Sequence, residues 1–263
     1  MDDSNPLAVE TQDLTRAFGG YLAVNNVSLR VPVGSFYGFV GPNGAGKSTT
    51  INMLTGLRSP SGGSARVLGY DLATQALEIK RRIGVVPEGS HLFERLTAAE
   101  HLQFVGRLYG LDAATAARRT AELLETMGLA ADAGKLVAAH SHGMRKKLAL
   151  CCALIHSPSL IFLDEPFEGI DAVATNHIRE LLARLRARGR TTIFLTSHVL
   201  EVVERLCTHI GVIDHGRLVA QGSLDELRRG ADGRERSLEE RFIELVSRDH
   251  GERPGLDWLG AEA

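Results

Sequence analysis

The stretch Gly41-Pro-Asn-Gly-Ala-Gly-Lys-Ser48 decides the fold of this chain of 263 residues. It matches the pattern G-x-x-x-x-G-K-[S/T], in which a glycine-rich turn connects a β-strand to an α-helix. Glycines let the backbone wrap closely around phosphate groups, and the N-terminus of the following helix adds its dipole to the same anion. In this arrangement Lys47 reaches the β- and γ-phosphates of a nucleotide, and the Ser48 hydroxyl occupies a Mg²⁺ ligand position.

The sequence on both sides of this loop supplies the strand and the helix that the pattern requires. Residues 36–40 form an apolar run, and Ile51, Leu54 and Leu57 recur on one helical face after the loop. A glycine-rich turn that holds a lysine by chance would lack this context, so we interpret the loop as a nucleotide-binding site. Its candidate contact residues are Gly41, Pro42, Asn43, Gly44, Ala45, Gly46, Lys47, Ser48 and Thr49.

A second apolar run, residues 160–163, ends in the acidic pair Asp164 and Glu165. A buried strand of an α/β sheet places its C-terminal residues at the ligand-binding edge. There Asp164 can bind Mg²⁺ through water, and Glu165, which points the other way, can polarise an attacking water. Phosphoryl transfer needs both a metal clamp and a water-positioning group. A solvated acidic turn is the alternative, and the phosphate loop makes it the weaker one.

Strands that alternate with helices predict an α/β fold. Short strands are expected over residues 7–40, and Thr97 with Glu100 predicts a helix that begins with a capping box. A helical block over residues 97–157 separates the parallel strands, which implies an inserted helical subdomain. The other expected strands are 83–86, 160–163, 192–196 and 210–213, and the other expected helices are 113–127, 141–155, 172–188 and 198–206.

Composition limits the classes of function. Hydrophobic residues make up 44% and charged residues 24%, as in ordinary soluble proteins. A net charge of −2 argues against a dedicated nucleic-acid binder, so no nucleic-acid partner is expected. The three cysteines lack metal-binding spacing and fit a reducing compartment. No secretory leader and no apolar segment of membrane-spanning length is recognised, which predicts a cytoplasmic protein that meets a membrane only through a partner.

Further motifs, in order from about residue 7 to residue 226, resemble those of the ATP-binding-cassette (ABC) ATPases. Residues 141–145, Ser-His-Gly-Met-Arg, open a helix and resemble the Leu-Ser-Gly-Gly-Gln signature of that family. Asp171 resembles its D-loop aspartate and His198 its switch histidine. Phe18 resembles the aromatic residue that stacks on adenine. Taken alone, His198 would be interpreted as a helix cap and Phe18 as a core residue.

The resemblance implies a P-loop NTPase (RecA-like) core with an N-terminal antiparallel β-subdomain and an inserted α-helical subdomain. The core is expected at 1–88 and 158–227, and the helical signature subdomain at 89–157. Residues 228–263 form a charged tail, in which the alternating charges predict a solvated helix and a linker. Ser237 and Glu240 are expected to cap the helix in that tail.

The resemblance also implies the activity, which is Mg²⁺-dependent hydrolysis of ATP to ADP and phosphate. Glu165, His198 and Lys47 are then the catalytic residues. Two copies close head-to-tail over two ATP molecules, and Ser141 and Gly143 of one copy contact the γ-phosphate bound to the other. The nucleotide-binding residues outside the phosphate loop are expected to be Phe18, Val24, Ser141, Gly143 and Asp171.

Two departures from the family pattern point to one subfamily. Residues 140–144, His-Ser-His-Gly-Met, lack the usual leucine, first glycine and glutamine, and this form resembles the ATPases that pair with ABC-2-type export permeases. Glu88 stands where the family has the Q-loop glutamine. Its carboxylate can bind Mg²⁺, directly or through water, or it is simply solvated. The expected metal-binding residues are therefore Ser48, Glu88 and Asp164.

We therefore expect the ATPase subunit of a membrane exporter, bound to separate transmembrane subunits on the cytoplasmic face of the membrane. The permease is expected to dock near residues 88–108, where Leu92, Phe93 and Leu96 are candidate contacts or core residues. The alternative is a soluble ABC ATPase, for example of the iron–sulfur cluster assembly type, although the signature of that type is closer to the standard form.

Overall fold

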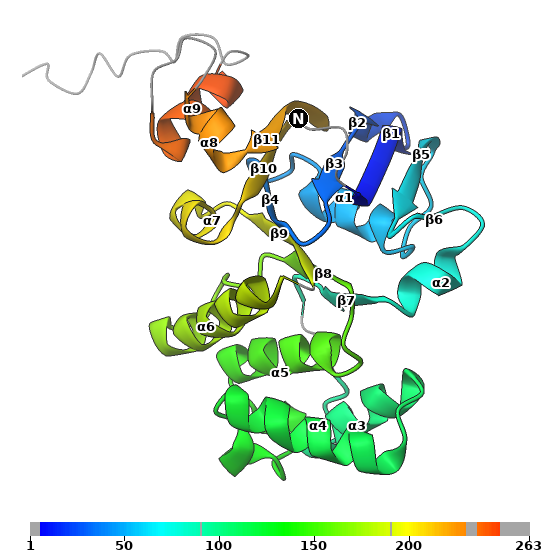
Figure 1. Cartoon of the computed structure of the whole chain (residues 1–263), viewed down its shortest axis with the longest axis vertical. Coiled ribbons are helices and arrows are strands. Elements are labelled where there is room, and N and C mark those ends of the chain that lie inside the picture. The colour runs from blue at the N-terminus through cyan, green and yellow to red at the C-terminus, as the bar shows by residue number, and fades with distance from the viewer. Residues whose placement is uncertain (1–5, 90, 190, 230–235, 248–263) are drawn as a thin grey trace, which may run out of the picture.

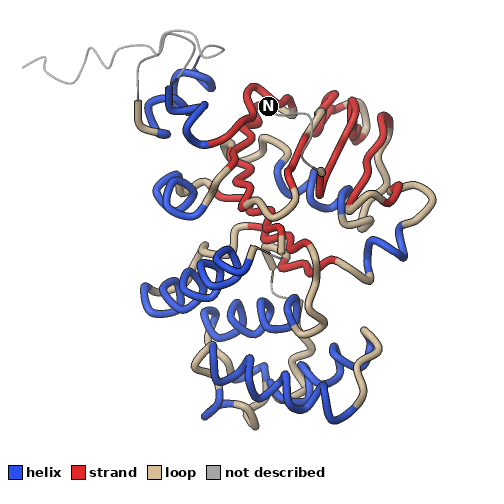
Figure 2. The backbone as a smooth tube through the Cα atoms, in the orientation of Figure 1, coloured by secondary structure: helices blue, strands red, loops and turns tan. Residues whose placement is uncertain are grey.

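The computed structural model describes residues 6–89, 91–189, 191–229 and 236–247, which fold around two β-sheets (Figure 1). The first sheet is antiparallel, with strand order β2-β1-β5-β6 and with β3 beside β1. Figure 2 shows its strands grouped together at one side of the molecule. These strands are β1 (Leu7–Phe18), β2 (Tyr21–Val27), β3 (Arg30–Pro32), β5 (Gly62–Val67) and β6 (Tyr70–Asp71). The antiparallel sheet that the resemblance implied is present.

The second sheet carries the candidate site and has the order β11-β10-β4-β9-β8-β7. All its neighbouring strands are parallel except β10 and β11, which pair antiparallel at one edge. Its strands are β4 (Phe36–Val40), β7 (Ile83–Val86), β8 (Leu160–Asp164), β9 (Thr192–Ser197), β10 (His209–Asp214) and β11 (Arg217–Ser223). Because β4, β9 and β8 are neighbours, the segments that follow their C-terminal ends meet at one edge of the sheet.

The middle of the second sheet is buried on both faces. Every residue of β4, β8 and β9 is buried. The rings of Tyr37 and Phe194 stack with their centroids 5.4 Å apart, and Phe162 lies 5.4 Å from Phe194 in a tilted arrangement. Parallel strands covered on both sides need apolar side chains at every position. This is why β4 and β8 appear in the sequence as unbroken apolar runs without alternation.

Three helices form a block between β7 and β8, and Figure 1 shows this block at the end of the molecule away from the antiparallel sheet. They are α3 (Ala98–Leu108), α4 (Ala113–Thr126) and α5 (His142–Leu154). The capping box predicted for Thr97 and Glu100 is confirmed at the start of α3. The remaining described α-helices are α1 (Lys47–Leu54), α2 (Ala76–Lys80), α6 (Ala172–Arg188), α7 (Leu200–Leu206), α8 (Leu224–Arg229) and α9 (Leu238–Ser247). The division into subdomains after residues 88 and 157 stays a prediction.

The charged tail differs from its prediction where the structure describes it. Helix α9 begins with the predicted cap, since Ser237 and Glu240 exchange backbone-to-side-chain hydrogen bonds of 2.9 and 3.2 Å. The helix is not fully solvated, however, because Leu238 and Val246 are buried and Phe242 packs against the same core. These apolar residues recur at helical spacing among the charges, which the alternating-charge interpretation overlooked. Residues 230–235 and 248–263 of the predicted tail lie outside the described residues.

Within the described ranges, none of the helices is long and apolar enough to cross a membrane. All three cysteines are free, and Cys151 and Cys207 are buried. Burial raises the pKa of the Cys151 thiol to about 12, which keeps it protonated and unreactive at neutral pH. Cys151 and Cys207 therefore act as small buried hydrophobic residues.

Candidate functional site

The predicted phosphate loop connects β4 to α1 and is folded around the side chain of Lys47. This side chain is 7% exposed, and its Nζ donates hydrogen bonds to the carbonyl oxygens of Gly41 (2.8 Å) and Pro42 (3.3 Å). Gly46 stands at the N-cap of α1 with φ 106°, a conformation that favours glycine. The lysine ammonium is thus held inside the loop at the helix N-terminus, where an anion binds most favourably.

Close packing explains two of the loop glycines independently of any phosphate. A Cβ atom on Gly41 would lie 2.2 Å from the carbonyl oxygen of Ile213, at the end of β10. A Cβ on Gly46 would lie 2.4 Å from the carbonyl oxygen of Ala23, in β2. The loop therefore packs closely against strands of both sheets, and this packing, which the sequence did not reveal, requires glycine at both positions.

The structure brings together Ser48 and Asp164, two of the three predicted metal-binding residues. Ser48 lies in the first turn of α1 and its hydroxyl donates to Asp164 Oδ1 at 3.1 Å. Asp164 is the last residue of β8 and is 4% exposed. A hydroxyl and a carboxylate are the hard oxygen ligands that Mg²⁺ prefers, so the pair fits this ion. The metal role of both residues stays a prediction.

Thr196, near the end of β9, is a site residue that the sequence analysis missed. Its hydroxyl donates to Asp164 Oδ1 at 2.6 Å and accepts a hydrogen bond from the backbone N–H of Glu165 at 3.0 Å. The strand register places Thr196 directly beside Asp164. The one available signal was a threonine that ends an apolar run two residues before His198, but its meaning depends on which strands are neighbours.

Glu165 lies at the centre of the three predicted catalytic residues. Its Oε1 is 3.5 Å from Lys47 Nζ, and its Oε2 is 3.0 Å from Nδ1 of His198. The backbone N–H of His198 also donates to Oε2 at 3.4 Å. Glu165 has φ 46°, a left-handed conformation that is uncommon for a residue with a Cβ atom. Such strain persists where surrounding contacts enforce it, often at functional sites.

Glu88, the third predicted metal-binding residue, follows β7 and is exposed. Its carbonyl oxygen accepts a hydrogen bond of 2.7 Å from Nζ of Lys146. The exposed carboxylate agrees with the alternative that Glu88 is solvated in this conformation, and its role toward Mg²⁺ stays a prediction.

The signature residues and the D-loop aspartate are neighbours. Ser141 is the N-cap of α5, and its exposed hydroxyl accepts a hydrogen bond from the backbone N–H of Met144 at 3.2 Å. A Cβ on Gly143 would lie 3.6 Å from Oδ2 of Asp171 and 3.1 Å from Cβ of Ala174. Asp171 caps α6, and the hydrogen bond from the backbone N–H of Ala174 holds the pKa of its carboxyl below the usual range. Two helix N-termini, of α5 and α6, therefore lie side by side.

The predicted adenine contact, Phe18, ends β1 with 38% of its surface exposed. The guanidinium groups of Arg16 and Arg58 lie 4.8 and 5.0 Å from the centre of its ring, at cation–π distance. Val24 is fully buried in β2, and its Cγ2 lies 3.4 Å from where a Cβ on Gly46 would stand. Val24 thus packs against the phosphate loop, and the adenine role of Phe18 stays a prediction.

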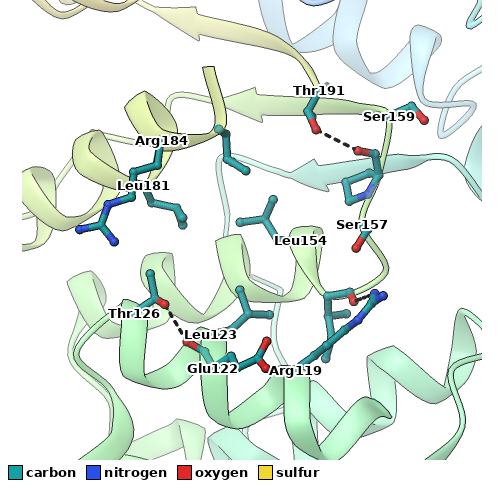
Figure 3. Close-up of a pocket in the computed structure, with 13 residues that line it drawn as sticks. Arg119, Glu122, Leu123, Thr126, Leu154, Ser157, Ser159, Leu181, Arg184 and Thr191 are labelled. Atoms are coloured by element: carbon teal, nitrogen blue, oxygen red, sulfur yellow. Dashed lines mark hydrogen bonds between the residues drawn. The ribbon is translucent and has the colours of Figure 1, made fainter. Parts of the chain in front are cut away.

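A cavity of about 880 Å³ lies between α4, the segment from α5 to β8, and α6 (Figure 3). Leucines 123, 154 and 181 line it, together with Arg119 and Arg184. Nη1 of Arg119 donates to the carbonyl oxygen of Ile155 at 2.7 Å, which connects α4 to the segment after α5. None of the predicted site residues lines this cavity, so it is separate from the candidate nucleotide site.

The fold and the site together define a P-loop ATPase, and comparison with known proteins gives its family. Residues 24–168 match the family model described as ABC transporter. The chain is 40% identical over 228 residues to the daunorubicin/doxorubicin resistance ATP-binding protein DrrA of Streptomyces peucetius, covering 87% of this chain and 69% of that protein. It is 39% identical over 219 residues to the Nod factor export ATP-binding protein I of Cupriavidus metallidurans, covering 83% and 72%.

A solved structure titled as the ATP-binding subunit of an ABC transporter aligns with a TM-score of 0.84 at 34% identity, covering 91% of this chain and 99% of that one. The chain therefore belongs to the ABC transporter family. The predictions of the fold class, of ATP as the bound nucleotide and of ATP hydrolysis in a transport system are confirmed.

Proposed function

We propose that this chain is the ATP-hydrolysing subunit of an exporter and drives a separate transmembrane permease. The observation that carries the proposal is the grouping of Lys47, Glu165 and His198 at the edge where β4, β8 and β9 end. The relatives named for drug resistance and for Nod factor export support the direction of transport. The altered signature, which keeps Ser141 and Gly143 but lacks the usual leucine, first glycine and glutamine, agrees with an export subfamily.

The residues of the site divide the work of phosphoryl transfer between them. Lys47 exchanges its bonds to the carbonyls of the loop for the β- and γ-phosphates of ATP. Ser48 and Asp164 hold Mg²⁺, which neutralises charge on the phosphates when bound. The carboxylate of Glu165 accepts the proton of the attacking water, and His198 hydrogen-bonds the γ-phosphate and keeps that water in line.

Two copies complete each site in this proposal. Ser141 and Gly143 stand at the N-terminus of α5, which favours anions, and they contact the γ-phosphate bound by the partner copy. The proximity of Gly143 to Asp171 supports a direct connection between that contact and α6. Closure of the dimer on ATP, and its reopening after hydrolysis, would then move the helical block that carries α5.

The proposed permease contact is an apolar surface formed by Phe93, Phe104 and Leu108. Phe93 is 59% exposed, Phe104 42% and Leu108 70%. The rings of Phe93 and Phe104 meet edge to face at 5.6 Å. Of the other two candidates, Leu92 packs against the core and Leu96 is half-buried. Phe93 lies five residues after Glu88, so a permease seated there would act on the segment that leads from β7 into α3.

The test is co-purification of the tagged Glu165→Gln protein from detergent-solubilised membranes in the presence of ATP. A stoichiometric polytopic membrane protein is expected, and the Phe93→Ser/Phe104→Ser variant should lose it while still binding ATP. Leu57→Ser, which alters an exposed leucine beyond α1, is the matched control and should retain the partner. Recovery of soluble partners alone would refute the transport role and favour a function of the cluster-assembly type.

A further inference from the structure

Lys146, in the second turn of the signature helix α5, is a buried cation at the junction of three segments. It is 2% exposed, and burial lowers the pKa of its ammonium. Its Nζ donates to the carbonyl oxygen of Glu88 at 2.7 Å and to that of Glu165 at 3.2 Å. One side chain thus links α5, the segment that leads from β7 into the helical block, and the end of β8.

The next residue, Lys147, shows that this placement is not a general property of lysines on α5. Lys147 is also buried, with 7% exposed. Its Nζ turns to the carbonyl oxygen of Met127 at 2.9 Å and lies 3.4 Å from Nδ1 of His177. The two consecutive buried lysines therefore contact different segments, and of the two only Lys146 contacts the segment that holds Glu165.

The contact of Lys146 acts on a peptide whose conformation is unfavourable. Glu165 has φ 46°, and its main chain is held on both sides. The N–H donates to Thr196 Oγ1 at 3.0 Å, and the carbonyl accepts from Lys146 Nζ and from the backbone N–H of Glu168, both at 3.2 Å. The orientation of these two main-chain groups fixes the direction in which the Glu165 side chain leaves the strand, toward Lys47 and His198.

We infer that Lys146 is a positioning residue for hydrolysis: by holding the carbonyl of Glu165 it keeps the catalytic carboxylate in place and ties it to the Glu88 segment. The inference rests on the proposed role of Glu165 in activating water. It adds that the helical block, through α5, supports the geometry of the core site of its own chain. A shift of α5 away from the core would remove the charged donor from the Glu165 carbonyl and leave only the backbone N–H of Glu168, so the position of the block and the hydrolytic step are coupled.

The first test compares Lys146→Met with Lys147→Met in the full chain, measuring the Kd for ATP, kcat and the melting temperature. Both lysines lie on α5, and each change removes a buried ammonium that donates to main-chain carbonyls outside that helix. Lys146→Met is expected to lower kcat about 10- to 100-fold, the usual effect of losing a supporting contact, with the Kd within about threefold of the wild type. Lys147→Met should keep kcat within about threefold. Equal losses of kcat in the two variants, or loss of ATP binding in Lys146→Met, would overturn the inference.

A second test asks whether Lys146 acts through Glu165. Adding Lys146→Met to Glu165→Gln should leave the residual hydrolysis of the single Glu165→Gln variant unchanged, because the carboxylate to be positioned is already absent. A further fall by the full factor seen in the wild-type background would contradict the assignment. If Glu165→Gln itself hydrolysed ATP at the wild-type rate, the proposed function would fail instead, so the two failures are distinguishable.

A third variant protects the test against misfolding. Lys146→Arg retains charged N–H donors at the same position, and it should recover a kcat higher than that of Lys146→Met. A folded Lys146→Arg protein that is no more active than Lys146→Met would count against a hydrogen-bonding role.

Discussion

Replacement of Thr196 by valine should lower both the stability of the protein and its rate of ATP hydrolysis, and comparison with a control variant should separate the two effects. Valine keeps the β-branched shape but removes the hydroxyl that donates to Asp164 and accepts from the N–H of Glu165. A hydrogen bond to a charged group contributes about 1.5–3 kcal/mol, and a buried N–H left without an acceptor costs about 1–3 kcal/mol. Because the two effects share one atom and are not additive, we expect the free energy of unfolding to fall by about 2–4 kcal/mol.

The effect on activity should exceed what this loss of stability explains. Thr196 contacts the carboxylate of Asp164 and the main chain of Glu165. Loss of such a supporting contact to a metal ligand typically costs 10- to 100-fold in metal affinity or activity. Steady-state ATP hydrolysis, with Mg²⁺ titrated, should therefore show a kcat lowered by about that factor well below the melting temperature. The apparent Mg²⁺ requirement should rise in parallel.

Thr192→Val on the same strand is the matched control. Thr192 is equally buried, and its hydroxyl accepts from the backbone N–H of Gly34 at 2.9 Å, at the opposite end of β9. It should lose stability, by about 1–3 kcal/mol, but keep the wild-type kcat. If the two variants lost activity in equal proportion, or if Thr196→Val retained full kcat, the assignment of Thr196 to the site would be refuted.

Three further predictions concern other parts of the structure. Lys47→Ala should abolish ATP binding measured by calorimetry, and retained micromolar affinity would argue against the phosphate-loop assignment. Ser141→Arg should leave ATP binding by the monomer intact but block hydrolysis, whereas loss of binding by the monomer would exclude its role in trans. The backbone N–H and hydroxyl of Thr97 hold the pKa of Glu100 below its ordinary value of 4.5. The stability that this contact contributes is therefore present above pH 4.5, and it is lost as the pH falls through the folded-state pKa. Glu100→Gln should therefore flatten the acid limb of a stability-against-pH curve, and an unchanged limb would contradict this.

The parts of the molecule that the sequence predicted well are those encoded locally. The phosphate loop, the acidic end of β8 and the caps of α3 and α9 each depend on residues within a few positions of one another. Capping boxes and glycine-rich turns satisfy hydrogen bonds that lie next to them in the chain, so their patterns are visible without tertiary structure. Alternation of strands and helices was likewise enough to indicate an α/β fold.

The parts that were missed depend on contacts between distant segments. Thr196 belongs to the site because β9 lies between β4 and β8 in a register that pairs it with Asp164. Lys146 reaches Glu88 and Glu165 across 58 and 19 residues of sequence, and no spacing rule connects them. Helix α9 looked solvated because burial of its apolar positions depends on the facing surface of α7 and β11. In each case the chemistry of the residue was visible but its neighbours were not.

In the proposed mechanism, ATP is held between the phosphate loop of one copy and the signature residues of another. The most direct measurement is light scattering of purified Glu165→Gln protein with Mg²⁺, with and without ATP, beside the Ser141→Arg/Glu165→Gln double variant. We expect a monomer without ATP, a dimer of twice the mass with ATP, and a double variant that binds ATP but stays monomeric. A Glu165→Gln protein that binds ATP and remains a monomer, or a double variant that dimerises as well as the single one, would contradict it.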